Sequence, residues 1–360
     1  APNAEADITG ISFEEDVLAN SYIDLNPSYD ESQNAYPIRI SVKEGTDMTS
    51  LAPIFELTPG ATISPASGSV QNFTTPVRYT VTSEDKAWHR VYAITAREQK
   101  ASNIPTTYHF EKVRIMQNVW QEFYEEQDSG NELTWASGNK GFKWAMSEAA
   151  TEDYPTTQID NGKTGKCVKL ETRLTGDLGN MVGMPIAAGN LFIGSFDMLN
   201  AITNPLSATR FGTPFYNKPL RLTGYYKYKA GEQFYENGEY TSRKDIFNIY
   251  AIFYDGVKYD SAGKGTDVTL DGNLPNQNYE HSSMVALALV SNPQETEGDE
   301  WKFFDIPFDY QRYGKKIDEA RLAKGEYKIG IIFASSKDGA TFEGAPGSTL
   351  LIDEVELIYE

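Results

Sequence analysis

Short segments in which apolar and polar residues alternate recur along the whole chain. Residues 36–42 and 77–81 are two early examples. Because successive side chains of a strand point to opposite faces, a period of two predicts strands with one buried face. Clusters of Gly, Pro, Asn and Asp between the segments predict turns. The pattern therefore restricts the chain to an all-β fold, and only residues 317–322 indicate a short helix.

Composition and charge further restrict the number of domains, the fold class and the partners of the protein. A chain of 360 residues is expected to hold more than one domain, and its 22 Tyr, 18 Phe and 5 Trp are typical of β-rich proteins. The net charge of -19 argues against nucleic acid or anionic membranes as partners, since both require basic patches. The small, polar residues 1–6 are those expected of a tether exposed when an export signal is removed.

The last strand is expected to close the larger domain. Residues 350–359 follow a Gly-Ala-Pro-Gly turn and are apolar enough to lie in the middle of a sheet, beside residues 108–111. Strict alternation would place Asp353 on one face with Leu351 and Val355, pointing into the core. A buried carboxylate needs an ion, a metal or hydrogen-bond donors as its partner.

Residues 1–97 contain six segments with strand character, which predicts an immunoglobulin-like (Ig-like) β-sandwich, and residues 98–107 read as a linker. Residues 45–53, 60–68 and 76–81 resemble the bacterial Ig-like modules that begin many envelope lipoproteins of gut anaerobes. The resemblance implies that this module acts mainly as a spacer.

Residues 108–360 are predicted to form a larger β-sandwich of the jelly-roll type. After an opening strand, the stretch to residue 144 reads as long surface loops. Before the terminal strand, strands are expected at residues 167–174, 191–196, 220–228, 247–254, 284–290, 301–308 and 327–335.

Several separated motifs of this region resemble one family, the putative carbohydrate metabolism domain. They are residues 189–196, 211–215, 218–219, 224–231 and 335–345. The resemblance implies a carbohydrate-related function in the cell envelope. It also implies that the protein is a lipoprotein, whose lipid anchor is absent from this chain. It names no reaction, so whether the protein is an enzyme stays open.

Four aromatic residues are candidates for binding a polysaccharide or oligosaccharide. Tyr225 shares a strand face with Arg221 and Lys227, and a flat ring beside hydrogen-bonding groups suits the C–H face of a sugar. Trp120, Trp135 and Trp144 are expected in loops, where binding residues are common. Packing in the sandwich is the alternative for each of them.

Acidic residues suggest two other kinds of site. In jelly-roll sugar-binding modules generally, carboxylates of the first and last strands often hold a structural calcium. Glu111 and Asp353 are the candidates for such a site here. The alternative is a hydrogen-bonded carboxylate without metal. A glycoside hydrolase needs two facing carboxylates, for which Glu171, Asp245 and Asp305 are available without forming a recognisable pair. The lone Cys167 reads as a buried thiol.

Three functions are therefore compared. The first is an exported envelope protein that binds a glycan through its jelly roll. The second is a glycoside hydrolase or related enzyme on the same fold, which predicts a cleft with two carboxylates about 5 to 10 Å apart. The third is an adhesin or stalk subunit with a protein partner, which predicts a large exposed apolar patch without a sugar-shaped groove.

Overall fold

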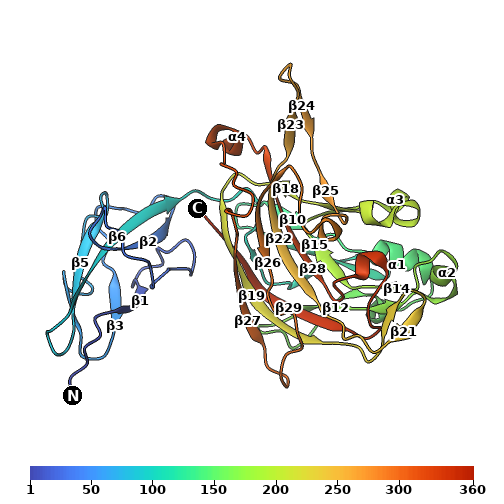
Figure 1. Cartoon of the computed structure of the whole chain (residues 1–360), viewed down its shortest axis with the longest axis horizontal. Coiled ribbons are helices and arrows are strands. Elements are labelled where there is room, and N and C mark those ends of the chain that lie inside the picture. Colours follow the sequence, from blue (N-terminus) through green and yellow to red (C-terminus); the bar gives the residue numbers. More distant parts are fainter. The chain divides into compact units, whose positions relative to one another are not determined.

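A computed structural model describes all residues, 1–360, and divides into two compact units (Figure 1). The first comprises residues 1–101, with Glu360 grouped to it, and the second residues 102–359. Strands dominate both units, which confirms the prediction of an all-β chain built from β-sandwiches. No helix has the length and apolar character needed to cross a membrane.

The first unit is a small sandwich of two sheets. One sheet has the order β2-β6-β5-β4, in which β2 and β6 run parallel, and β1 pairs with β3 in the other. Tyr79, Tyr92 and Ile94 lie in the core between them. All six expected segments are strands: β1 (Ile8–Ser12), β2 (Tyr36–Lys43), β3 (Ile54–Leu57), β4 (Thr62–Ser64), β5 (Val77–Thr82) and β6 (His89–Gln99).

The second unit is built on two packed antiparallel sheets. The first sheet has the order β11-β12-β29-β19-β27, with β7 also on β29, and the second has the order β15-β28-β22-β26, with β18 on β28. Their facing side chains, such as Leu222, Phe253 and Ile331, form one core. The strands of the first sheet are β7 (Thr107–Tyr108), β11 (Thr156–Ile159), β12 (Cys167–Glu171), β19 (Pro219–Lys229), β27 (Lys302–Pro307) and β29 (Thr349–Tyr359). Those of the second are β15 (Asn190–Phe192), β18 (Thr213–Pro214), β22 (Asn248–Asp255), β26 (Met284–Leu289) and β28 (Tyr327–Ala334).

Strand β29 lies inside the first sheet, as expected. It pairs with β19 on one side and with β12 and β7 on the other, where Val355 lies opposite Tyr108. The predicted orientation of Asp353 is wrong, however. Ile352 and Val355 both enter the core, because Glu354 adopts a positive φ of 48° and interrupts the alternation. Asp353 therefore faces away from the core.

The stretch after residue 108 is more ordered than the expected surface loops. It forms a three-stranded sheet of β8 (Lys112–Met116), β9 (Trp120–Glu126) and β10 (Glu132–Thr134), followed by helix α1 (Asn139–Ala145). Two further short helices, α2 (Gly176–Met181) and α3 (Met198–Thr203), were not predicted. Figure 1 shows these three helices gathered at one side of the larger unit, beside β15 and β28.

Smaller elements complete the larger unit. They are β13 (Arg173–Leu174), β14 (Ile186–Ala187), β16 (Gly194–Phe196), β17 (Thr209–Phe211), β20 (Phe234–Glu236), β21 (Glu239–Thr241), β23 (Val257–Tyr259), β24 (Gly265–Asp267), β25 (Leu270–Asp271), the 3-10 turns η1 (Thr151–Asp153), η2 (Pro205–Ser207), η3 (Pro275–Gln277) and η4 (Gly339–Thr341), and helix α4 (Glu319–Ala323). The expected helix at residues 317–322 corresponds to α4, and Asp318 caps it by accepting hydrogen bonds from two backbone N–H groups.

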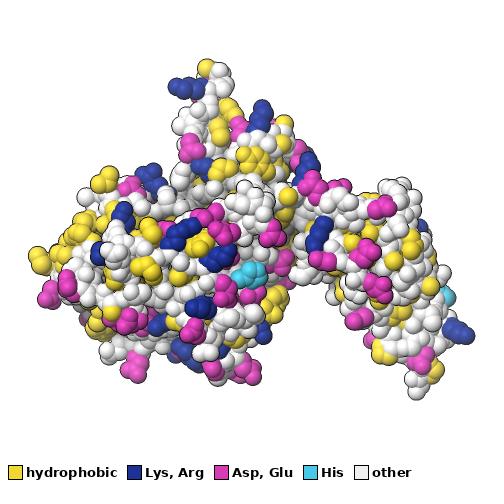
Figure 2. Space-filling model, turned by 180° about the vertical axis from the view of Figure 1, so that it is seen from behind, with side chains coloured by type: hydrophobic (Ala, Val, Ile, Leu, Met, Phe, Trp, Pro, Cys, Tyr) yellow, Lys and Arg dark blue, Asp and Glu magenta, His cyan; other side chains and the backbone are white.

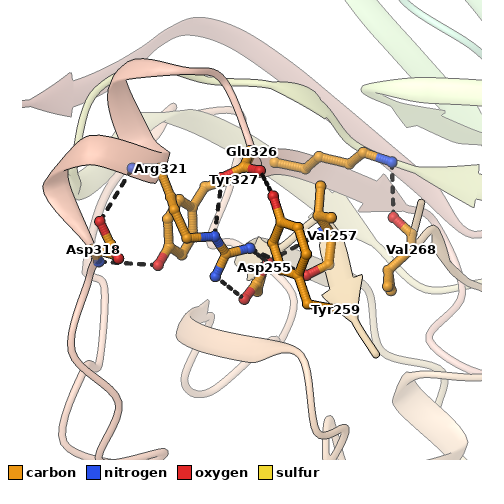
Figure 3. A network of polar contacts seen from close by, with 9 residues as sticks. Asp255, Val257, Tyr259, Val268, Asp318, Arg321, Glu326 and Tyr327 are labelled. Carbon is orange, nitrogen blue, oxygen red and sulfur yellow. Dashed lines mark hydrogen bonds and ion pairs between the residues drawn. The ribbon is translucent and has the colours of Figure 1, made fainter. Parts of the chain in front are cut away.

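Arg321 of α4 fastens the β23–β24 hairpin to the sandwich (Figure 3). Its guanidinium donates to both carboxylate oxygens of Asp255, at 2.6 and 2.8 Å, to Glu326 at 3.0 Å and to the Val257 carbonyl at 3.1 Å. Tyr259 of the hairpin bonds Glu326 and lies under the guanidinium. One planar cation thus joins a helix, a strand and a hairpin.

Candidate functional site

A pocket lies between the three short helices and the outer face of the second sheet. Its volume is about 190 Å³, and its walls come from α1, α2, α3, η4 and strands β15, β17, β22 and β28. Residues 138–145, 190–196 and 334–342 contribute to it. Residues 190–196 and 335–342 lie in motifs that carry the family resemblance, so segments far apart in sequence meet here. We call it the α1–α3 pocket.

Aromatic side chains form much of the wall. They are Phe142, Trp144, Phe192, Phe196, Phe211, Tyr250 and Phe342. Several are fixed edge to face: Phe142 against Tyr154 at 5.1 Å and Phe211 against Tyr250 at 6.2 Å between ring centres. Packed pairs of this kind hold rings in place without hydrogen bonds. The pocket therefore has preformed apolar surfaces.

Three polar groups in the pocket have hydrogen-bonding capacity to spare. Asn190 uses Oδ1 to accept from the Gly138 N–H at 2.7 Å, which leaves its Nδ2 donor without a protein partner. Asn248 uses Nδ2 to donate to the Tyr279 hydroxyl at 2.9 Å, which leaves Oδ1 as an acceptor. The Tyr250 hydroxyl makes no hydrogen bond within the protein, and burial raises its pKa well above the usual value.

The buried carboxylate of Asp245 holds one wall of the pocket in place. Oδ2 of Asp245 accepts hydrogen bonds from Ser336 Oγ at 2.6 Å, Ser348 Oγ at 2.7 Å and the Ala345 N–H at 2.8 Å. Burial raises the pKa of Asp245, while these donors favour its charged form. Asp245 does not line the pocket but fixes the segment around Ser336, which does. It is a positioning residue.

The electrostatic character of the pocket is nearly neutral. Among its lining residues Lys337 is the only charged one, and no Asp or Glu belongs to them. Around the helices the surface is apolar, with Leu178 and Met181 of α2 and Leu199 and Ile202 of α3 exposed. A ligand with apolar faces and a few hydroxyl groups suits such a site better than a strongly charged one.

The predicted tryptophans have separate positions. Trp144 lies on α1, is 38% exposed and lines the pocket. Trp120 is buried at the start of β9, and Trp135 is only 1% exposed and packs against Tyr108 at 5.0 Å. The loop assignment was wrong for Trp120 and Trp144, and the rings of Trp120 and Trp135 present no face to a ligand because the core covers them.

Tyr225 lies on the other sheet, away from the pocket. Its ring is partly exposed on the outer face of β19 and lies 5.2 Å from that of Phe303 on β27. The sequence reasoning did not single out Phe303, although alternation along residues 301–308 places it on the same face as Asp305.

Glu111 and Asp353 act on one loop, residues 160–166, between β11 and β12. Glu111 Oε1 accepts from the Lys166 N–H at 2.8 Å, and Asp353 Oδ2 from the Thr164 N–H at 3.0 Å. Asp353 is completely buried, and this burial raises its pKa to about 6. No group of three or more His, Cys, Asp or Glu residues is placed to hold a metal ion. Each carboxylate accepts a hydrogen bond from a backbone N–H of the loop, and calcium stays a prediction.

The remaining sequence candidates have structural partners. Glu171 pairs with Lys169 at 2.9 Å and with Arg173 at 3.2 Å, and Asp305 pairs with Arg221 at 2.6 Å. Burial raises the pKa of the Cys167 thiol to about 12, so the reactive thiolate is disfavoured.

The sequence did not predict three of the pocket residues, Asn190, Asn248 and Tyr250. Only Asn190 gave a signal, as part of a motif that carried the resemblance.

Comparison with known proteins agrees with the two-unit architecture. The model of the putative carbohydrate metabolism domain matches residues 109–358, and the model described as "SGBP, N-terminal" matches residues 24–96. No curated protein matches the chain.

Two solved structures are similar over long ranges, and both carry the name putative glycoside hydrolase. One, from Bacteroides vulgatus, is 50% identical over 72% of this chain and all of its own, with a TM-score of 0.67. The other, from Bacteroides thetaiotaomicron, is 45% identical over 100% of this chain and 98% of its own, with a TM-score of 0.64. The chain belongs to the putative carbohydrate metabolism domain family.

Proposed function

We propose that the protein binds a carbohydrate in the α1–α3 pocket and does not cleave it. The observation that carries the proposal is the composition of the pocket: aromatic walls, the spare groups of Asn190, Asn248 and Tyr250, and no lining carboxylate. Membership in a carbohydrate-related family supports the class of ligand.

The chemistry of a sugar matches both kinds of surface. The C–H groups on one face of a pyranose ring pack against aromatic rings, and its hydroxyls both donate and accept. Asn248 Oδ1 would accept from one hydroxyl and Asn190 Nδ2 would donate to another, while Tyr250 can do either. Because Tyr279 and Gly138 already hold the two amides, little ordering entropy is lost on binding.

Hydrolysis is the weaker alternative. It needs an acid and a second carboxylate flanking the scissile bond, whereas the pocket lining contains neither. Of the acidic candidates, Glu171 and Asp305 are ion-paired and Asp245 is buried outside the pocket. The two relatives named as putative glycoside hydrolases keep this alternative worth testing.

We further propose that the protein is exported to the cell surface, where the Ig-like unit is a spacer and a lipid outside this chain is the anchor. The match of residues 24–96 to the SGBP N-terminal model supports a surface location. The adhesin alternative predicted an apolar patch without a groove. Here the exposed apolar residues of α2 and α3 lie beside a pocket, which favours a glycan.

Calorimetric titration against a panel of plant, host and microbial glycans tests the proposal. For a glycan that binds, Trp144→Ala is expected to weaken affinity about tenfold, because one wall of the pocket is lost. Trp88→Ala is the matched control, since Trp88 is an exposed tryptophan of the Ig-like unit. If Trp144→Ala bound the glycan with unchanged affinity, the α1–α3 pocket would not be the binding site. Release of new reducing ends from the bound glycan would establish hydrolysis instead.

A further inference from the structure

A second aromatic surface lies on the outer face of the first sheet. Tyr225 of β19 is directly opposite Phe303 of β27, and Trp301 precedes the same strand. Phe303 is 53% exposed, so much of its ring faces solvent next to Tyr225. The core side of these strands is already filled by Tyr226 and Phe304. We call this surface the Tyr225 face.

Two lysines flank these rings. Lys163 Nζ lies 5.0 Å from the centre of the Tyr225 ring, and Lys227 Nζ lies 4.9 Å from that of Trp301. On the face drawn in Figure 2, Lys and Arg side chains are interspersed with Asp and Glu. Lys163 makes no ion pair, and Lys227 pairs only with Asp299, whose side chain is fully exposed. The Lys163 ammonium is thus available to an anion on a chain of net charge -19, whereas the Lys227 ammonium would exchange Asp299 for the ligand.

Two carboxylates hold the backbone of the loop that carries Lys163. Asp353 and Glu111 accept hydrogen bonds from its backbone at Thr164 and Lys166. Gly162 permits this close approach, since a Cβ there would lie 2.7 Å from Asp353 Oδ2. A loop held by two carboxylates keeps Lys163 over Tyr225 before any ligand arrives, which lowers the entropy cost of binding.

We propose that the Tyr225 face binds an acidic polysaccharide, one whose sugar rings carry carboxylates. The exposed Phe303 ring accepts the C–H face of a sugar, and the ammonium groups of Lys163 and Lys227 pair with carboxylates on the same or the next unit. The outer face of two paired strands, unlike a pocket, can bind the middle of a long chain. The α1–α3 pocket, which contains no acidic side chain and only one cation, is chemically distinct from it.

Titration of the full chain with an oligogalacturonate of four units, against the neutral galactose oligomer of the same length, tests this inference. The acidic oligomer is expected to bind at least tenfold more tightly, with an affinity that falls as salt rises. Phe303→Ala and Lys163→Gln are each expected to weaken binding about 3- to 10-fold, because one removes an aromatic contact and the other a charge-assisted hydrogen bond. Both side chains are exposed, so the fold should persist, and thermal unfolding checks this.

Trp144→Ala is the matched control, because it alters the pocket and leaves the Tyr225 face intact. Loss of acidic-oligomer binding in Trp144→Ala with full binding in the two face variants would overturn the inference and assign this ligand to the pocket. Absence of binding, or equal affinity for both oligomers, would also overturn it. The pocket proposal is tested by the effect of Trp144→Ala on binding of neutral glycans and this one by the effect of Phe303→Ala and Lys163→Gln on the acidic oligomer, so the two proposals fail separately.

Discussion

At the scale of single residues, the sequence shows which side chains could act but not which are exposed. Trp120, Trp135 and Trp144 occur in the same polar, aromatic stretch, yet only Trp144 reaches a pocket. Tertiary packing made the difference, since Trp135 packs among Tyr108 and other core rings. Asp353 was predicted to be buried and is, but on the opposite side of its sheet. One positive-φ residue, Glu354, reversed its direction, and nothing in the alternation reveals such a bulge.

Burial of Asp353 leads to a pH-dependent stability. Its pKa is raised from 3.8 to about 6 in the folded protein, so between these values the folded state holds more protons than the unfolded state. The contribution of this group to the free energy of unfolding therefore falls as pH rises through this window, by at most about 1.4 kcal/mol per pH unit.

Asp353→Asn, which cannot ionise, is expected to remove that contribution. Chemical denaturation of both proteins from pH 4 to pH 7 measures it: the wild-type free energy of unfolding, minus that of the variant, should decrease as pH rises. Parallel curves would show that Asp353 does not titrate in this range. Glu171→Gln serves as the control for a partly exposed, ion-paired carboxylate.

At the scale of elements, strands were predictable because a period of two is a local signal. Segments 220–228 and 327–335 became β19 and β28 almost unchanged. The pocket helices gave no such signal: α2 and α3 have six residues each, and α2 contains two glycines, so no helical period can develop. The site was therefore harder to predict than the fold, since its walls are short elements joined only in three dimensions.

The β23–β24 hairpin should depend on Arg321. Arg321→Lys keeps the positive charge but loses the two parallel bonds to Asp255 and the contact with Val257 (Figure 3). Because these groups are partly buried and the hydrogen bonds to Asp255 are charge-assisted, the expected loss is about 1 to 3 kcal/mol of unfolding free energy. Hydrogen exchange should become faster in β23 and α4 while β29 is unaffected. Equal exchange in the variant and the wild type would show that the hairpin is stable without this cation.

At the scale of the whole molecule, the path of the chain through the sheets of the larger unit determines which part of the protein can fold by itself. Strand β29 is the last element, yet it lies between β12 and β19, so the sheet is complete only when the end of the chain is in place. Both proposed carbohydrate surfaces, the α1–α3 pocket and the Tyr225 face, use residues of 102–359 alone. The Ig-like unit has its own core and contributes to neither.

Residues 102–360 expressed alone are therefore expected to unfold in one cooperative transition and to bind a given glycan within about twofold of the full chain, a difference of roughly 0.4 kcal/mol. Calorimetry on both forms measures transition and affinity together. If the shortened protein lost binding while its transition persisted, the Ig-like unit would contribute to recognition and would not be a spacer. A form ending at residue 348 is the complementary control, because removal of a central strand leaves the edges of β12 and β19 unpaired and should prevent folding.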